Sequence, residues 1–101
     1  MEEFLKEYLT ILRYEKNLSE NTTKSYKSDL QKLLAFLTKT KVKDFSEVTS
    51  NIIAKFFERQ RKSGVDSATS ARYMSSIKGF FRFLENNSYI EKNPTEKLSP
   101  V

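Results

Sequence analysis

Short polar and basic side chains recur at helical spacing in two segments of the chain, opposite stripes of apolar residues. The face opposite the first stripe carries Asn21, Ser25, Ser28 and Lys32, flanked by Lys24. The face opposite the second carries Ala68, Arg72, Ser75, Gly79 and Arg82, flanked by Thr69, Ser76 and Lys78. Both faces combine short hydrogen-bonding side chains with positive charge, which is typical of a surface that contacts nucleic acid.

The side chains that most often carry catalysis or bind metals are missing from the sequence. It contains no histidine and no cysteine, so the usual general base, zinc ligands and thiol nucleophile are absent. Its two glycines, Gly64 and Gly79, form no phosphate-binding loop. None of the five tyrosines has neighbours in the sequence that would activate it. We therefore expect no catalysis by this chain alone, no metal and no cofactor.

Basic residues are concentrated in two stretches of a chain whose net charge is +5. Residues 21–43 contain six lysines and one aspartate, and residues 55–82 contain seven basic and two acidic residues. Each stretch therefore has a net charge of +5, and most glutamates lie outside both. This segregation favours a basic face for a polyanion. A helical protein with a lysine-rich surface would show the same total, so charge alone leaves both interpretations open.

Length and composition indicate a single helical domain. A chain of 101 residues can sustain one core without a metal or a disulfide. Two glycines and two prolines favour long helices over turn-rich β structure. The sequence shows no signal-peptide pattern, and no apolar run approaches the roughly 18 residues of a membrane span. We therefore expect a cytoplasmic protein without membrane contact.

Apolar residues at helical spacing predict four amphipathic helices. The predicted helices cover residues 2–16, 20–38, 50–62 and 68–86. Small hydroxyl residues precede the last three helices and are predicted to accept a backbone N–H as N-caps. These predicted caps are Ser19, Thr49 and Ser67.

The residues between and after these helices are expected to close the core. Gly64 is predicted to adopt the left-handed conformation that ends the third helix. Gly79, inside the fourth helix, could permit the close approach of another backbone, but tolerance of the glycine is the preferred interpretation. The non-helical residues expected to pack on the core are Val42, Phe45, Val48, Tyr89, Ile90 and Leu98.

The order of these features resembles the N-terminal core-binding domain of tyrosine recombinases, in the style of the Xer and phage-integrase branches. The matching pieces are Asn17-Leu18-Ser19-Glu20-Asn21-Thr22, Tyr26, Asp29-Leu30, Val48-Thr49, Ser67-Ala68-Thr69-Ser70-Ala71-Arg72, Ser75, Ile77-Lys78, Phe80-Phe81-Arg82-Phe83-Leu84 and Ile90-Glu91-Lys92-Asn93-Pro94. Each piece is common by itself, whereas the ordered set is fairly specific and covers nearly the whole chain.

The resemblance implies an all-α, four-to-five-helix orthogonal bundle of the SAM-like core-binding type. It assigns residues 1–97 to a DNA-binding domain and residues 98–101 to the start of an interdomain linker. It also implies half of a clamp on a recombination half-site, with the second and fourth helices in the major groove. The implied partners are double-stranded DNA, a C-terminal catalytic domain of the same parent chain, and a recombinase tetramer on DNA. The family's catalytic residues belong to that other domain.

Carried over to this sequence, the family's DNA contacts fall on ten residues of the second and fourth helices. They are Asn21, Thr22, Lys24, Ser25, Ser28, Thr69, Arg72, Ser75, Ser76 and Lys78. For Arg72, the alternative is a surface salt bridge with Asp66 or Glu85. The DNA role is preferred because the polar face of the fourth helix is nearly free of acids. We also expect Arg72→Ala to spare folding, because the apolar stripe is untouched.

A different class of function also fits the pattern of four amphipathic helices. The chain could be a helical protein–protein interaction module that docks through the exposed side of its first helix. Binding to DNA should weaken steeply as salt rises, because counterions are released from the phosphates. Docking through apolar surface should not, so a salt series separates the two functions.

Overall fold

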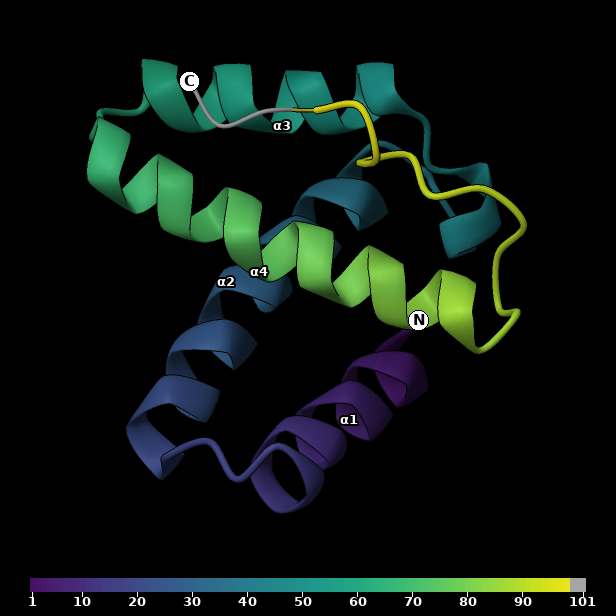
Figure 1. Cartoon of the computed structure of the whole chain (residues 1–101). Helices are drawn as coiled ribbons and strands as arrows, with labels where there is room; N and C mark the ends of the chain where they lie inside the picture. The colour runs from purple at the N-terminus through teal and green to yellow at the C-terminus, as the bar shows by residue number, and fades with distance from the viewer. Residues whose placement is uncertain (99–101) are drawn as a thin grey trace.

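The computed structural model describes residues 1–98 as a bundle of four α-helices with two short helical turns (Figure 1). The α-helices are α1 (Glu2–Thr10), α2 (Glu20–Lys39), α3 (Ser50–Lys62) and α4 (Ser67–Asn86). The turns are η1 (Ile11–Glu15), which is π-helical, and η2 (Phe45–Glu47), which is 3₁₀-helical. No strand occurs among these residues, so the predicted all-α class is confirmed.

The two longest helices, α2 and α4, cross at the centre of the molecule (Figure 1). The chain turns back between α1 and α2, so these helices form one side of the bundle. α3 lies along the opposite side of α4 and is antiparallel to it (Figure 1). α4 therefore contacts each of the other three α-helices.

The core is built from the predicted apolar stripes together with the turn η2. The fully buried stripe residues are Leu30, Leu33 and Leu37 of α2, Ile53 and Phe56 of α3, and Ile77, Phe80, Phe81 and Leu84 of α4. Phe45 of η2 is also buried, and its ring centroid lies 5.0 Å from that of Phe80 and 5.8 Å from that of Phe81. Both contacts are edge-to-face, which is a favoured aromatic geometry.

Two of the three predicted N-caps are confirmed. The Ser19 hydroxyl accepts the backbone N–H of Thr22 at 3.1 Å, at the start of α2. The Thr49 hydroxyl accepts the backbone N–H of Ile52 at 3.3 Å, at the start of α3. Each bond satisfies one of the N–H groups that a helix start leaves without an internal partner.

The predicted cap of α4 is wrong by one residue. The N-cap is Asp66, whose Oδ1 accepts the backbone N–H of Thr69 at 2.8 Å, and Ser67 is the first residue of the helix. This hydrogen bond lowers the pKa of the Asp66 carboxyl. A carboxylate is a strong cap because its charge also interacts with the positive end of the helix dipole.

The first predicted helix is α-helical only as far as Thr10. It continues as the π-helical turn η1, in which the backbone N–H of Lys16 donates to the Ile11 carbonyl at 3.0 Å. This i→i+5 bond widens the turn by one residue. Leu12, within the turn, stays buried. The predicted extent of the helical segment is therefore nearly right, while its final turn is of a different type.

Gly79 is explained by a close contact with α1, which corrects its interpretation as a merely tolerated residue. A Cβ atom at this position would lie 2.7 Å from the hydroxyl oxygen of Tyr8. The Tyr8 ring packs on Phe80 and Phe83, with centroid distances of 5.5 Å and 5.1 Å. Burial raises the pKa of Tyr8 to about 12. Gly79 thus leaves room for the ring that joins α1 to α4.

The segments outside the helices pack as predicted. The buried members of the predicted set are Val42, Phe45, Val48 and Ile90, and Leu98 packs partly buried against the core. Tyr89 is 37% exposed, although its ring stacks on Phe4 with centroids 4.4 Å apart. Gly64 has a φ of +96°, as expected. The division between domain and linker stays a prediction, and residues 99–101 lie outside the described residues.

Candidate functional site

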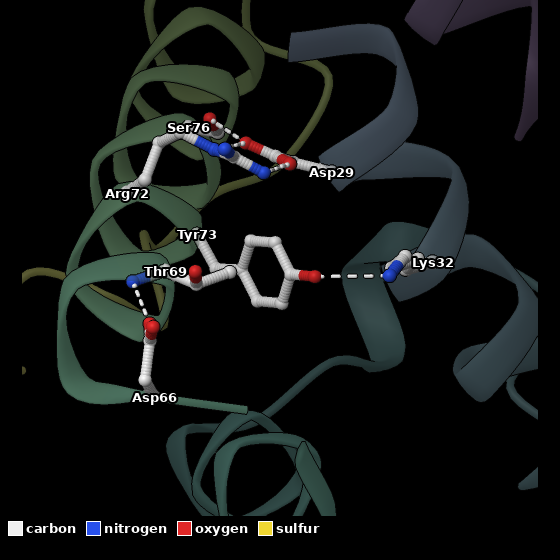
Figure 2. Close-up of polar contacts among 7 residues, drawn as sticks. All are labelled: Asp29, Lys32, Asp66, Thr69, Arg72, Tyr73 and Ser76. Atoms are coloured by element: carbon white, nitrogen blue, oxygen red, sulfur yellow. Dashed lines mark hydrogen bonds and ion pairs between the residues drawn. The ribbon is translucent and has the colours of Figure 1, made fainter. Parts of the chain in front are cut away.

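Asp29 of α2 joins the two central helices through a buried carboxylate (Figure 2). Arg72 donates to it from Nε at 3.1 Å and from Nη2 at 2.8 Å, and the Ser76 hydroxyl donates at 2.9 Å. All three donors come from α4, and the exposed fraction of Asp29 is 0%. A buried carboxylate is costly unless it is paired and hydrogen-bonded. The three bonds meet that requirement and tie α2 to α4.

Arg72 also faces solvent, with 52% of its side chain exposed. Of its five N–H donors, Asp29 takes one from Nε and one from Nη2, which leaves the terminal edge formed by Nη1 and Nη2. The hydrogen bond to Asp29 raises the pKa of Arg72, so the guanidinium stays charged. Two parallel N–H groups match phosphate oxygens or the N7 and O6 atoms of guanine. Asp29 therefore fixes the guanidinium plane and leaves one edge able to bind a ligand.

Tyr73 of α4 lies between two cationic side chains, one from each central helix (Figure 2). Lys32 of α2 donates from Nζ to the Tyr73 hydroxyl at 3.0 Å. Lys32 Nζ lies 5.5 Å from the centroid of the Tyr73 ring, and Arg72 Cζ lies 5.6 Å from it. Because Lys32 Nζ is hydrogen-bonded to the hydroxyl, it lies beyond the phenolic oxygen at the edge of the ring, and only the Arg72 guanidinium is placed for cation–π attraction. Positive charge from α2 and from α4 is therefore brought together around one aromatic ring.

Six of the ten predicted residues extend this region along the two helices. They are Asn21, Ser25 and Ser28 on α2, and Thr69, Arg72 and Ser75 on α4. The α2 members recur at i, i+4 and i+7, a spacing that places them on one side of the helix, and Lys32 continues it at i+11. Thr69 is half-buried and the other five are exposed. We call these six residues together with Lys32 the polar face.

Three other predicted residues have partners of their own. The Thr22 hydroxyl accepts from the Ser19 hydroxyl at 2.9 Å, so Thr22 belongs to the cap of α2. Lys24 Nζ lies 3.7 Å from Glu20 Oε1, in an exposed ion pair. Ser76 is 2% exposed and donates its hydroxyl to the buried carboxylate, so its side chain does not reach the surface.

Lys78 is set apart from the polar face by helix geometry. It follows Arg72 by six residues, which rotates it about 120° around α4 at 3.6 residues per turn. It is half-buried on that other side of the helix. The alternative that Arg72 forms a salt bridge is correct in kind, but its partner is Asp29 instead of Asp66 or Glu85.

Sequence reasoning missed Asp29 and Tyr73 as parts of the site, and it placed Lys32 on the polar face without including it among the ten contact residues. Asp29 is the only acidic residue in the lysine-rich stretch 21–43, and it lies at the edge of the leucine stripe. An acid in such a place signals a basic partner on another helix. The sequence does not identify that partner, because Arg72 is 43 positions away. Tyr73 belongs to the apolar stripe, and its hydroxyl contact depends on how α2 and α4 cross.

Residues 1–98 contain neither a candidate metal site nor a helix that could span a membrane. No group of three or more acidic, histidine or cysteine side chains in this part of the chain is placed to hold a metal ion. None of its helices is both long and apolar enough to cross a membrane.

Sequence comparisons place the chain among recombinase N-terminal regions. Residues 5–87 match the family model described as "Phage integrase, N-terminal SAM-like domain". A tyrosine recombinase XerC of Pseudomonas syringae is 32% identical over 100 residues, which cover 99% of this chain and 33% of the relative. A tyrosine recombinase XerD of Staphylococcus haemolyticus is 30% identical over 95 residues, which cover 94% and 32%. The chain thus spans about a third of the length of these relatives.

A comparison with solved structures supports the same fold. The crystal structure of the N-terminal domain of a phage integrase/site-specific recombinase from Haloarcula marismortui superposes with a TM-score of 0.90. The match covers 99% of this chain and 94% of the other, at 18% sequence identity. This similarity confirms the predicted SAM-like bundle.

Proposed function

Because the chain belongs to the phage integrase N-terminal SAM-like domain family, the N-terminal core-binding region of tyrosine recombinases, we propose that it binds double-stranded DNA in site-specific recombination. The observation that carries the proposal is the arrangement of Arg72. Its guanidinium is fixed by the buried Asp29, and its free edge faces solvent on a surface otherwise lined by serine, asparagine, threonine and lysine. A donor edge held in one orientation is suited to an acceptor pair on DNA.

In this proposal, α2 and α4 face the major groove and the domain forms half of a clamp. The other half is a catalytic domain in the C-terminal part of the same parent chain, and the assembly is a recombinase tetramer on DNA in the cytoplasm. Arg72 contacts a guanine or a phosphate, and the remaining members of the polar face contact phosphates and base edges. Thr22, Lys24 and Lys78 are outer contacts to phosphates. Ser76 contributes indirectly, by holding Asp29.

The proposal assigns no chemical step to this chain. Strand exchange through a tyrosine-linked DNA intermediate belongs to the remaining part of the parent enzyme. Burial raises the pKa of Tyr8 to about 12 and keeps its hydroxyl protonated, which is the opposite of activation. A suicide half-site incubated with this chain alone should therefore give no covalent adduct on a denaturing gel.

A pair of isosteric charge changes tests the DNA-binding surface. Asn21 on α2 and Asn51 on α3 are both exposed and both occupy the second position of their helix. Asn21→Asp and Asn51→Asp each lower the net charge by one and interact equally with a helix start. On a short mixed-sequence duplex, Asn21→Asp should weaken binding about fivefold, since a like charge near a phosphate costs about 1 kcal/mol in water. Asn51→Asp should bind nearly as well as wild type.

The outcome of this experiment separates a docked surface from diffuse attraction. Equal weakening by the two variants would mean that DNA affinity depends only on the net charge of the domain. The proposal that the polar face contacts DNA would then be rejected. Affinity of the wild-type domain is expected to be weak and poorly specific, because half of a clamp lacks the effective-concentration gain of its tethered partner. Its binding should weaken linearly with the logarithm of salt concentration.

A protein–protein contact through the first helix is a second candidate, favoured by one observation. Tyr14 in η1 is 78% exposed, with the guanidinium of Arg13 5.8 Å from its ring centroid. Exposed tyrosine is enriched at protein interfaces. Tyr14→Ala should leave DNA binding unchanged. If it reduces assembly of the parent recombinase on DNA, the first helix serves subunit contact and both functions coexist.

A further inference from the structure

We propose that Lys32 and Tyr73 form a phosphate-binding site on the polar face, beside Arg72. The inference rests on the proposed function, because the phosphate it concerns is a phosphate group of the DNA backbone. Lys32 was not among the ten residues carried over from the family pattern, and Tyr73 belongs to the buried stripe. The two side chains meet where α2 and α4 cross, on the same side as the guanidinium of Arg72 (Figure 2).

The bond between these two residues leaves protons without acceptors. A lysine ammonium has three donors and no acceptor, so the Tyr73 oxygen must accept in the 3.0 Å bond. The phenolic proton is then free to donate, yet residues 1–98 supply it with no hydrogen-bond acceptor. Tyr73 is only 3% exposed, and its hydroxyl points at Lys32 (Figure 2). Lys32 is exposed, so a phenolic proton without an acceptor next to its ammonium points to an anionic ligand reached from solvent.

The local charge favours the same kind of ligand. Arg72 is balanced by the carboxylate of Asp29, whereas Lys32 has no carboxylate within ion-pair distance in the described part of the chain. Lys32, Arg72 and Asp29 together therefore carry one net positive charge, located at Lys32. The groups that remain free are the other ammonium protons, the phenolic proton and the terminal edge of the guanidinium, which are all donors, and a phosphate supplies only acceptors. Phosphate contacts of this kind fix the position of a protein on duplex DNA.

A purely structural role for the pair makes a different prediction about one substitution. Lys32→Gln keeps a side-chain donor for the Tyr73 hydroxyl but removes the charge. If the pair only ties α2 to α4, this variant should bind DNA as wild type does. If Lys32 binds a phosphate, the variant should lose one phosphate contact, and Lys32→Ala should lose the same one.

The experiment measures binding of the 101-residue chain to a short mixed-sequence DNA duplex over a series of salt concentrations. Lys32→Gln should reduce the slope of log affinity against log salt by about 0.9, the value for one phosphate contact. The matched control is Lys27→Ala, which removes one exposed charge from another side of α2 and should leave the slope nearly unchanged. Tyr73→Phe should weaken binding about 2- to 10-fold without changing the slope, because it removes one neutral hydrogen bond.

Each outcome supports or overturns the inference. Thermal unfolding followed by circular dichroism confirms that every variant is folded at the titration temperature. If wild type binds with a clear salt dependence and Lys32→Gln matches Lys27→Ala, this inference fails while the proposed function stands. If Tyr73→Phe binds DNA as tightly as wild type, the Tyr73 hydroxyl does not contact the phosphate, and that part of the inference is wrong. If wild type shows no salt-dependent binding, the proposed function and this inference both fail.

Discussion

α4 is held on two of its sides by contacts of opposite kinds. Toward α2, it is joined by a buried carboxylate that accepts from Arg72 and Ser76. Toward α1, it is joined by the ring of Tyr8, which packs on Phe80 and over Gly79. The first contact is directional, because each hydrogen bond has a preferred angle and length. The second depends on buried area and close fit, and rings have several favourable arrangements.

The two contacts have different roles. The aromatic contact stabilises the fold, whereas the polar contact also presents a side chain at the surface. The aromatic contact partly buries Tyr8 against the core, so it stabilises the bundle without orienting a charged group on the surface. The polar contact buries Asp29 and leaves half of Arg72 in solvent. One ion pair therefore both joins two helices and orients a cation on the polar face. Stability and ligand binding should accordingly be coupled on the α2 side of α4 and independent on the α1 side.

The largest expected effect comes from breaking the polar contact. Arg72→Ala leaves a fully buried carboxylate with one hydroxyl donor, and should lower the free energy of unfolding by about 2–4 kcal/mol. This revises the expectation that the substitution spares folding. Arg59 is exposed and lies 5.6 Å from the ring of Phe36, so Arg59→Ala should cost about 0.5 kcal/mol. Urea unfolding measures the free energy of unfolding of both variants. Similar losses would mean that the buried carboxylate of Asp29 does not need Arg72 for its stability.

DNA binding should separate the same two arginines, again with the larger loss at Arg72. If Arg72 contacts a guanine, Arg72→Ala should cost about 1–3 kcal/mol of binding and relax sequence preference. If it contacts phosphate, the loss should be uniform across sequences, with a salt slope lower by about one unit. Arg59→Ala should cost less. Titrations at a temperature where both variants are folded provide the comparison.

A double substitution separates lost contact from new repulsion at this site. Arg72→Ala also leaves the negative charge of Asp29 uncompensated, which would repel DNA. Asp29→Asn combined with Arg72→Ala removes both charges and keeps an acceptor for Ser76. If binding by the double variant returns to the wild-type value, Arg72 makes no contact of its own with DNA.

The aromatic contact is tested by a smaller change that can have either sign. Gly79→Ala gains about 1 kcal/mol of helix propensity but places a Cβ atom 2.7 Å from the Tyr8 hydroxyl oxygen. It should be neutral or destabilising in the wild type. With Tyr8→Phe, the nearest remaining ring atom lies 3.9 Å away, so the same substitution should stabilise by about 1 kcal/mol. Thermal unfolding of the four proteins in this cycle measures the coupling, and additive effects would contradict the steric explanation.

The smallest expected effect concerns the two caps at the starts of α2 and α4. Ser19→Ala should cost about 1 kcal/mol at every pH, since the serine does not titrate. The pKa of Asp66 is lowered by its bond from Thr69, so its stabilising effect is present above the ordinary aspartate value of 3.8. That effect is lost as the pH falls through the lower folded-state pKa. Asp66→Ala should therefore destabilise the fold at neutral pH and have little effect in strong acid. Unfolding curves across this range test the sign, and a pH-independent cost of Asp66→Ala would contradict it.

The sequence predicted the aromatic side of α4 better than the polar side, for a physical reason. Apolar stripes repeat locally, so the burial of Phe80, Phe81 and Leu84 can be inferred from spacing within one helix. The bond between Asp29 and Arg72 depends on how two helices cross, and no local pattern contains that crossing. Helix starts were predicted less reliably than the apolar stripes but better than the contact between α2 and α4. Ser19 was predicted correctly, whereas Asp66 and Ser67 are adjacent and both suitable, so spacing alone did not choose between them.

The other predicted residues of the site follow the same division. Asn21, Ser25 and Ser28 were placed on one face because a single helix determines their arrangement. Ser76 was placed with them by resemblance, and the structure buries it against α2 because a carboxylate there needs donors. Lys32 lies on the predicted face, but only the contact with Tyr73 reveals its partner.

The distance along the chain between Asp29 and Arg72 has a consequence for how the molecule opens and closes. Pairing residues 43 positions apart requires a long loop to close, with an entropic cost paid before the bond forms. The carboxylate loses its water only when α2 and α4 are docked, so the pair should form after the transition state for folding. Interactions formed that late slow unfolding and leave the folding rate nearly unchanged. The ion pair would then set the lifetime of the closed bundle, and with it the resistance of the domain to proteases that cleave the open chain.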